Sequence, residues 1–254
     1  MPGFETKKGG SPMLFEVKHV THRYKDGDVE RVVLDDVNLS LEKGKFYTIM
    51  GESGSGKSTL LSLMGTLEPL QEGKLFFRDK EVTDPLAFRR LQLGFVFQSY
   101  NLISYMTAHE NVEVALRLGK ADLSAAKEVA DRLEKSPLTP QEQKEDTADP
   151  LTRLLLLFGL DQAKSSRVVT KLSGGEQQRV AIVRAIAKNP SILLCDEPTG
   201  NLDQKTSEGI VAYFELLAHT LGMCVIVVTH DPRIAERSDQ SFVLDPVLKR
   251  PVQQ

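Results

Sequence analysis

The chain has 254 residues, of which 41% are hydrophobic and 26% charged, as in an ordinary globular protein. This length suffices for one large domain or for a core domain that carries a subdomain. The net charge of −3 gives no electrostatic case for nucleic acid as a partner. No apolar run approaches the roughly 18–20 residues of a membrane-spanning helix, so we expect any membrane role to come through a partner chain. Cys195 and Cys224 lie in apolar runs and are interpreted as buried, reduced thiols of a cytoplasmic protein.

Residues 1–12 lack the apolar segment of a secretory signal and are interpreted as a flexible lead-in. Beyond them, Val32–Leu41 alternates partly between apolar and polar residues, as a half-buried strand does. Phe46–Met50, Ile192–Cys195 and Cys224–Val228 are short apolar runs typical of buried strands. Such runs, separated by helical segments, indicate a mostly parallel sheet covered on both faces. Ligands collect at the carboxyl ends of such strands, so the polar residues that follow these runs are expected to converge on one site.

A phosphate-binding loop follows Met50. Gly51–Ser58 reads G-x-x-x-x-G-K-[ST], in which glycines let backbone N–H groups turn toward phosphate oxygens. Lys57 would reach the β- and γ-phosphates, and the Ser58 hydroxyl would be a ligand of Mg²⁺. A helix that begins at Lys57 and ends near Gly65 would direct the positive end of its dipole at the same charge. We therefore predict a nucleotide site, the alternative being a Gly/Ser turn that binds nothing.

The middle of the chain, about 97–188, predicts helices. Ala125–Leu133 has apolar residues at helical spacing, and Thr139–Glu142 forms a capping box with proline at the first helical position. Asp149 and Pro150 begin another helix that ends near Gly159. The polar stretch Ser136–Asp149 predicts an exposed insertion, within a polar segment of about 120–149. We interpret residues 13–254 as a single domain, in which a nucleotide-binding core (13–96 and 189–254) is interrupted by a helical subdomain.

Two acidic residues end the apolar run Ile192–Cys195. At the end of such a strand Asp196 is placed to hold Mg²⁺, and Glu197 can accept a proton from an attacking water. Acids at strand ends also serve in purely structural hydrogen bonds. The phosphate-binding loop is what favours the functional interpretation here.

A second anion-binding helix start lies at Ser173-Gly174-Gly175-Glu176. Ser173 and Glu176 form a capping box that opens a helix over Gly175–Lys188. Glycines are poor helix formers, so their presence in the first turn suggests that another group approaches the backbone closely. A helix start with free N–H groups and a hydroxyl is a good anion site, yet one nucleotide would not easily need both this site and the loop.

The string Leu172–Glu176 resembles the signature motif of ABC ATPases. The other motifs of that family are also present, in the family's order, between Leu14 and about Leu244. In the family this motif closes over the γ-phosphate of ATP bound to the other subunit. The resemblance implies an α/β fold: a P-loop NTPase core with a mostly parallel sheet, an antiparallel β portion on the N-terminal side, and an inserted α-helical subdomain. It also implies an ATPase that uses ATP and Mg²⁺ and works as a homodimer.

The resemblance assigns further roles. Tyr24 matches the aromatic that stacks on adenine, Gln98 the glutamine that links core and helical subdomain, and His230 the histidine that contacts the γ-phosphate. The implied ATP-binding residues are Tyr24, Gly51, Glu52, Ser53, Gly54, Ser55, Gly56, Lys57, Ser58 and Thr59. Those implied to act on the partner's ATP are Ser173, Gly174, Gly175 and Glu176, with Asn201, Leu202 and Asp203 in a loop that crosses the dimer interface. The implied catalytic residues are Glu197, His230, Gln98 and Lys57, and the implied metal ligands are Ser58, Gln98 and Asp196.

Each single residue has a plainer interpretation. Tyr24 could be a surface tyrosine, Gln98 an ordinary strand-end residue and His230 a satisfied strand-end histidine. Their positions relative to the loop, the two subdomains and the sheet edge favour the functional interpretation. Asp203 is expected to organise the interface and not to accept a proton. No chemistry is assigned to the remaining histidines, His19, His22, His109 and His219.

Leu34 with Asp36-Val37, Thr107–Val112 and Pro198–Asp203 resemble the branch that serves lipoprotein release and macrolide or antimicrobial-peptide efflux. In that branch the ATPase pairs with a membrane permease. This implies a cytoplasmic protein held at the inner face of the cell membrane, working in export, extraction or mechanotransmission of a lipoprotein, peptide or drug. The segment of about 120–149 is longer and more polar than is usual in the family. A non-transport ABC ATPase and a regulatory ATP-binding protein are the alternatives.

Overall fold

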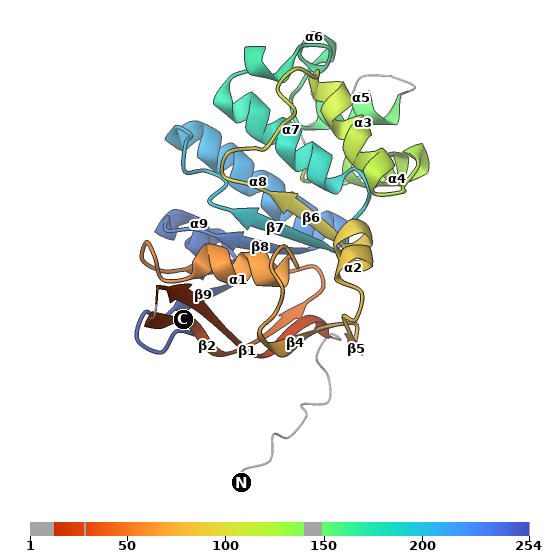
Figure 1. Ribbon diagram of the computed structural model, residues 1–254. Helices are drawn as coiled ribbons and strands as arrows, with labels where there is room; N and C mark the ends of the chain where they lie inside the picture. The colour runs from red at the N-terminus through yellow and green to blue at the C-terminus, as the bar shows by residue number, and fades with distance from the viewer. Residues whose placement is uncertain (1–12, 28, 140–148, 254) are drawn as a thin grey trace.

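A computed structural model describes residues 13–27, 29–139 and 149–253 of the chain. The strands are β1 (Met13–Asp26), β2 (Val29–Glu42), β3 (Phe46–Met50), β4 (Glu72–Phe77), β5 (Lys80–Glu81), β6 (Leu93–Val96), β7 (Ile192–Asp196), β8 (Cys224–Val228), β9 (Gln240–Leu244) and β10 (Pro251–Gln253). The helices are α1 (Lys57–Met64), α2 (Pro85–Gln92), α3 (Ala108–Leu118), α4 (Leu123–Glu134), α5 (Pro150–Leu157), α6 (Gln162–Ser165), the 3₁₀ turn η2 (Val169–Lys171), α7 (Gly174–Ile186), α8 (Gln204–Leu221) and α9 (Pro232–Arg237). Figure 1 shows the helices arranged around two sheets.

The larger sheet has the strand order β10-β9-β3-β8-β7-β6, and all its neighbouring pairs are parallel except β9 with β10. Successive side chains of a strand point to opposite faces, and both faces of this sheet are covered. In β7, Leu193 and Cys195 join a cluster formed with α7 and α8, whereas Ile192 and Leu194 join one formed with α1. The predicted mostly parallel sheet, covered on both faces, is confirmed.

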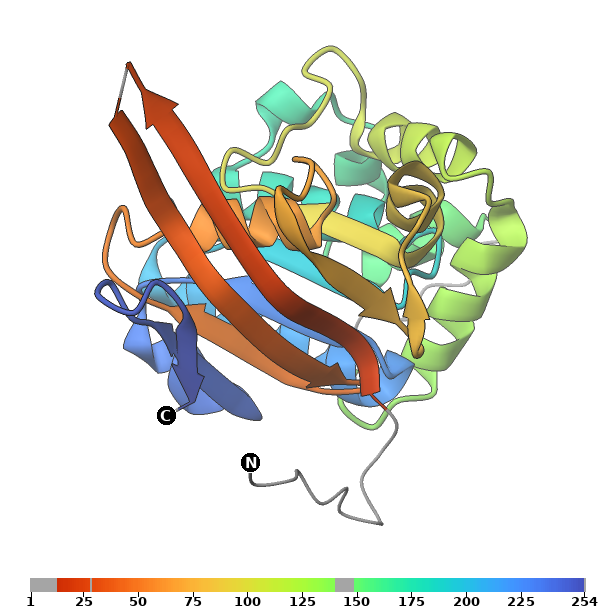
Figure 2. The same cartoon turned by 60° about the horizontal axis from the view of Figure 1, so that its bottom comes forward.

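The smaller sheet is antiparallel, with the order β2-β1-β4-β5. Its main feature is the long β1–β2 hairpin, which extends across the molecule in Figure 2. Inward-facing residues of this hairpin, such as Phe15 and Leu34, pack in the same cluster as Leu60 and Leu61 of α1. The antiparallel β portion implied by the family resemblance is therefore present, and it holds α1 against the larger sheet.

Helices α3 to α7 gather at the end of the molecule opposite the smaller sheet (Figure 1). Several of these helices begin at a residue whose side chain caps the first turn. Thr107 and Glu110 form a capping box at α3, and Asp122 and Asp149 cap α4 and α5. Proline occupies the first turn of α5, as predicted. The leucines of α5 are buried and most of them belong to the larger core cluster.

The expected exposed insertion is wrong at its beginning. Ser136 and Thr139 are buried, because their hydroxyls have partners: Ser136 Oγ lies 2.8 Å from Thr220 Oγ1, and Thr139 Oγ1 donates to the Leu133 carbonyl over 2.6 Å. Helix α4, inside the segment of about 120–149, also contributes buried residues to the core. The rest of the predicted capping box at Pro140–Glu142 and the lead-in at 1–12 lie outside the described residues.

Both cysteines are buried and free, as expected. Burial raises the pKa of the Cys195 and Cys224 thiols, which keeps both in the unreactive protonated form.

Candidate nucleotide-binding site

The carboxyl ends of β3, β8, β7 and β6, which are adjacent in the larger sheet, open onto one cleft of about 860 Å³. The phosphate-binding loop follows β3, and Gln98, Glu197 and His230 follow β6, β7 and β8 in turn. The cleft is lined by Tyr24, Arg31, Val33, Gly51, Glu52, Ser53, Gly54, Gly56, Lys57, Ser58, Thr59, Gln98, Glu197 and His230. Parallel strands thus bring together residues that are far apart in the sequence.

The phosphate-binding loop has the backbone that its glycines permit. Gly56 adopts φ +100° at the N-cap of α1, and a Cβ there would lie 2.8 Å from Val33 Cγ1. The Lys57 ammonium donates to the Gly51 and Glu52 carbonyls over 2.8 and 2.7 Å, so it is held inside the loop. Ser55, a residue of the loop, is buried and is not among the lining residues. The loop therefore presents N–H groups, a cation and the start of a helix to the cleft.

The Ser58 hydroxyl donates to Asp196 Oδ1 over 3.1 Å, which links the loop to the end of β7. Burial raises the pKa of Asp196, and the Ser58 hydrogen bond and Lys57 partly offset this effect while Glu197 adds to it. A hydroxyl, a carboxylate and the nearby Gln98 amide are hard oxygen donors that fit Mg²⁺, provided that phosphates and water supply the remaining ligands. Among the described residues, no group of three or more His, Cys, Asp and Glu side chains could hold a metal without a nucleotide.

Glu197 directly follows β7 and adopts a left-handed backbone with φ +44°. Its N–H donates to the Val228 carbonyl over 2.9 Å, and its Oε2 lies 3.0 Å from His230 Nδ1. The Glu197 side chain is 16% exposed and that of His230 is 71% exposed. A left-handed conformation is costly for a residue with a Cβ, and such strain often accompanies functional sites.

The loop that carries Gln98 is attached to helix α7. Tyr100 and Asn101 both have left-handed backbones, with φ +62° and +48°. The partly buried Arg184 guanidinium of α7 donates to the carbonyls of both residues, over 2.7 Å at Tyr100. Because α7 begins at the Ser173 motif, the Gln98 loop and that motif are connected through one helix.

The Ser173 motif forms the predicted capping box: the Ser173 N–H donates to Glu176 Oε2 over 2.9 Å, and the Glu176 N–H donates to Ser173 Oγ. We expected another group to approach the glycines of this motif closely, and at Gly175 a residue of the same chain does so. A Cβ at Gly175 would lie 2.5 Å from Thr206 Cγ2 of α8. Within the described residues, none of Ser173, Gly174, Gly175 and Glu176 lines the cleft.

The neighbouring loop, with Asn201, Leu202 and Asp203, also lies outside the cleft lining. Asp203 has a role that the sequence did not indicate. Its carboxylate caps α8, accepting from the Thr206 N–H over 3.0 Å and from the Thr206 hydroxyl over 2.6 Å. Leu202 packs against the core cluster, so this loop is anchored at two points.

Arg31 and Val33 line the cleft but were not expected there. Arg31 is paired with Tyr24 across the β1–β2 hairpin, and Val33 lies at a register shift of β2, between the partners of His22 and Arg23. Simple alternation along β2 does not predict this position of Val33. Each histidine to which no chemistry was assigned lies within 3.7 Å of a carboxylate in an ion-pair arrangement: His19 by Asp36, His22 by Glu68, His109 by Asp149 and His219 by Asp239.

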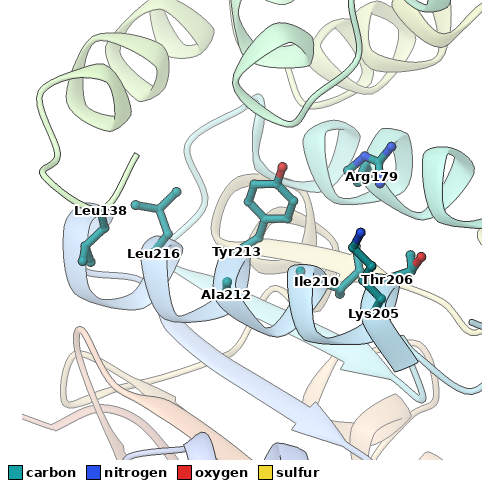
Figure 3. A pocket seen from close by; sticks show the side chains of 9 residues that line it. Leu138, Arg179, Lys205, Thr206, Ile210, Ala212, Tyr213 and Leu216 are labelled. Carbon is teal, nitrogen blue, oxygen red and sulfur yellow. The ribbon is translucent and has the colours of Figure 1, made fainter. Parts of the chain in front are cut away.

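A separate hollow of about 370 Å³ lies between α7 and α8 (Figure 3). Figure 3 shows Arg179 of α7 and Lys205, Thr206 and Tyr213 of α8 around it. It shares no lining residue with the cleft of the phosphate-binding loop, so it is not part of the nucleotide site.

The family model described as ABC transporter matches residues 34–200. The chain is 38% identical over 237 residues to the lipoprotein-releasing system ATP-binding protein LolD of Shewanella oneidensis, covering 91% of this chain and 94% of LolD. It belongs to the ABC transporter family. It is also 37% identical over 236 residues to the macrolide export ATP-binding/permease protein MacB of Pasteurella multocida, covering 91% of this chain but only 33% of MacB.

Among solved structures, the chain is similar to the dimeric structure of MJ0796, a bacterial ABC transporter cassette, with a TM-score of 0.77 and 35% identity over 95% of this chain and 98% of that one. A second dimeric structure of MJ0796 is described as a post-hydrolysis state bound to ADP and Pi. The expected ABC ATPase, its fold and its resemblance to the lipoprotein-release and macrolide-efflux branch are confirmed. None of the helices in the described ranges has the length and apolarity needed to cross a bilayer.

Proposed function

We propose that two copies of this ABC ATPase enclose two ATP molecules between them, each bound to the phosphate loop of one chain and the Ser173 motif of the other. One observation supports this most directly: a single chain carries both anion-binding helix starts, but only the phosphate-binding loop lines the cleft. The dimeric structures of MJ0796 support the same arrangement. ATP would then join the two chains, and hydrolysis would release them.

The residues of the cleft would divide the chemistry as follows. Glu197 would take the proton from water that attacks the γ-phosphoryl group, and His230, 3.0 Å away, would hold that carboxylate in place. Lys57, the loop N–H groups and the partner's Ser173 motif would offset the charge that develops on the phosphate oxygens. Ser58, Asp196 and Gln98 would hold Mg²⁺, which neutralises charge on the β- and γ-phosphates when bound. Tyr24 would stack on the base.

We further propose that the pair drives a membrane permease from the cytoplasmic side. The names of the similar LolD and MacB support export, extraction or mechanotransmission of a lipoprotein, peptide or drug. The match covers only a third of MacB, which is named as both ATP-binding protein and permease. Residues of about 97–188 would form a subdomain that moves against the core (13–96 and 189–254).

A hollow of about 300 Å³ lies beside the Gln98 loop and would receive the permease; Phe97, Arg184 and Lys188 are among its lining residues. Arg184 and Lys188 donate to backbone carbonyls, and in the described part of the chain neither forms an ion pair. Both therefore remain able to meet acidic groups of a partner.

Dilution tests the proposed pairing. If two chains form each site, the rate of ATP hydrolysis per chain should fall as the chain concentration is lowered below the dissociation constant of the pair. A rate per chain that stays constant over a thousandfold dilution would contradict the proposal. Purification from native membranes, followed by identification of the integral membrane protein that accompanies the chain, tests the permease.

A further inference from the structure

Tyr24 is unusually well held for a side chain that is 42% exposed. Its hydroxyl donates to Glu68 Oε2 over 3.0 Å and lies 3.4 Å from Thr59 Oγ1. An exposed aromatic ring without such contacts can rotate about its side-chain bonds, and ordering it on ligand binding reduces affinity. The ring of Tyr24 is already ordered before any ligand arrives.

His22 supports the same ring from the interior. It lies two residues before Tyr24 on the same face of β1 and is only 4% exposed. The two rings meet edge to face, with centroids 4.8 Å apart and an interplanar angle of 76°. Neither nitrogen of His22 has a hydrogen-bond partner among the described residues, but Nε2 lies 3.7 Å from the Glu68 oxygen that Tyr24 uses. Glu68 Oε2 is thus the point to which both rings are directed.

These contacts connect Tyr24 to both ends of the phosphate-binding helix. Thr59 lies in the first turn of α1, and Glu68 lies in the loop after its last turn. Burial raises the pKa of Tyr24, and Glu68 raises it further, so the phenol keeps the proton that it donates. The wall that would contact the base and the helix that would hold the phosphates therefore form one connected unit.

We propose that Glu68 is a positioning residue that holds the Tyr24 ring ready to stack on the nucleotide base, with His22 as its buried support. The inference rests on the proposed function, which gives Tyr24 its place at the base. Its consequence is selective: Glu68 should favour ligands that carry a base and leave the binding of phosphate alone unaffected, because within the described residues no hydrogen bond or ion pair joins Glu68 to Gly51–Ser58.

Calorimetric titration with two probes tests the proposal. MgADP carries the base and the phosphates, whereas Mg-pyrophosphate carries the phosphates alone. Neither is a nucleoside triphosphate, so ATP hydrolysis does not complicate the titration. We expect Glu68→Ala to weaken MgADP binding about three- to tenfold, as expected for a ring that must now be ordered on binding, and to change pyrophosphate binding less than about twofold. Glu68→Gln keeps an oxygen that can accept from the tyrosine and should recover most of the loss.

Tyr24→Phe supplies the matched control, because it keeps the stacking ring and removes only the hydroxyl. It should reproduce the effect of Glu68→Ala, and the double variant should bind MgADP no more weakly than either single variant. Thermal unfolding of each variant verifies that it is folded.

Losses that add in the double variant, or an equal loss for MgADP and pyrophosphate in Glu68→Ala, would overturn the inference while leaving the proposed function standing. If the unaltered protein bound MgADP no more tightly than pyrophosphate, Tyr24 would not stack, and the inference would fall together with that base contact. If it bound neither probe, the proposed function itself would fail.

Discussion

His230 Nδ1 lies 3.0 Å from Glu197 Oε2, so the residues that follow β7 and β8 meet in the cleft of the phosphate-binding loop. The contact is made possible by the left-handed backbone at Glu197 and by the parallel pairing of the two strands. An acid that is mostly buried is thereby held by a histidine that is mostly exposed. At this pair, an attacking water would lie between the γ-phosphate and the carboxylate that accepts its proton.

Replacing His230 should therefore affect turnover more than binding. We expect His230→Ala to lower the maximal rate of ATP hydrolysis about 100-fold, because Glu197 loses the group that orients it. MgADP binding should change less than about twofold, since ADP has no γ-phosphate for the histidine to contact. Steady-state ATPase assays and calorimetry give the two quantities. An unchanged rate in a folded variant would show that the contact has no catalytic use.

Replacing Lys57 should have the opposite pattern. Its ammonium is held inside the phosphate-binding loop by the Gly51 and Glu52 carbonyls, where phosphate oxygens would meet it. Loss of such charge-assisted hydrogen bonds costs about 1.5–3 kcal/mol, so Lys57→Ala should weaken MgATP binding about 10- to 100-fold. Binding is measured by displacement of a fluorescent ATP analogue. Equal affinity in the variant and the unaltered protein would remove Lys57 from the phosphate site.

Ser173→Arg should separate ATP binding from pairing. The large cation would stand where the partner's γ-phosphate is expected, so pairing and hydrolysis should both be lost. MgATP binding to the single chain should be retained, because Ser173 does not line the cleft. The substitution also removes the N-cap of α7, which costs about 1 kcal/mol of stability. Ser173→Ala is the control, since it loses the same cap without adding bulk or charge. If a folded Ser173→Arg variant saturated with MgATP still paired with a second chain, Ser173 would not face the partner's γ-phosphate.

The residues at the carboxyl end of the larger sheet were largely predictable from the sequence. Ile192–Cys195 and Cys224–Val228 are short apolar runs that polar residues follow directly, and their length and β-branched or aliphatic content favour buried strands. Once the strands are parallel neighbours, the residues after them must share one edge. The capping box at Ser173 was equally local, because the residues that satisfy the helix start lie within one turn.

Contacts made across long sequence separations were not predictable. Glu68 reaches Tyr24 only because the β1–β2 hairpin folds over α1, and no local pattern records that packing. Thr206 lies where a side chain at Gly175 would go, but this clash becomes apparent only when α7 and α8 are placed side by side. Ser136 and Thr139 had a polar, exposed appearance in the sequence, but hydroxyls can be buried wherever a carbonyl or another hydroxyl is within reach.

Lys188 predicts a pH dependence of stability. Burial lowers its pKa from an ordinary value of 10.5 to about 8. Between these two values the unfolded chain binds the proton that the folded chain has released, so the free energy of unfolding should rise with pH across this interval and be lowest below pH 8. One pKa unit corresponds to about 1.4 kcal/mol, so the rise attributable to Lys188 should be on the order of 3 kcal/mol.

Denaturant unfolding at pH 7.5 and pH 10 measures this difference, and Lys188→Met is the matched control because its side chain does not titrate. The rise of the unaltered protein should exceed that of the variant. Identical pH dependence in the two proteins would mean that Lys188 titrates normally in the fold.

The account depends above all on ATP joining two chains, and Glu197→Gln tests this most directly. This variant should bind MgATP, fail to hydrolyse it, and therefore remain paired. In sedimentation velocity we expect single chains without nucleotide and dimers at saturating MgATP, and single chains again when Ser173→Arg is added to the same variant. A Glu197→Gln protein that is saturated with MgATP and still sediments as a single chain would contradict the account.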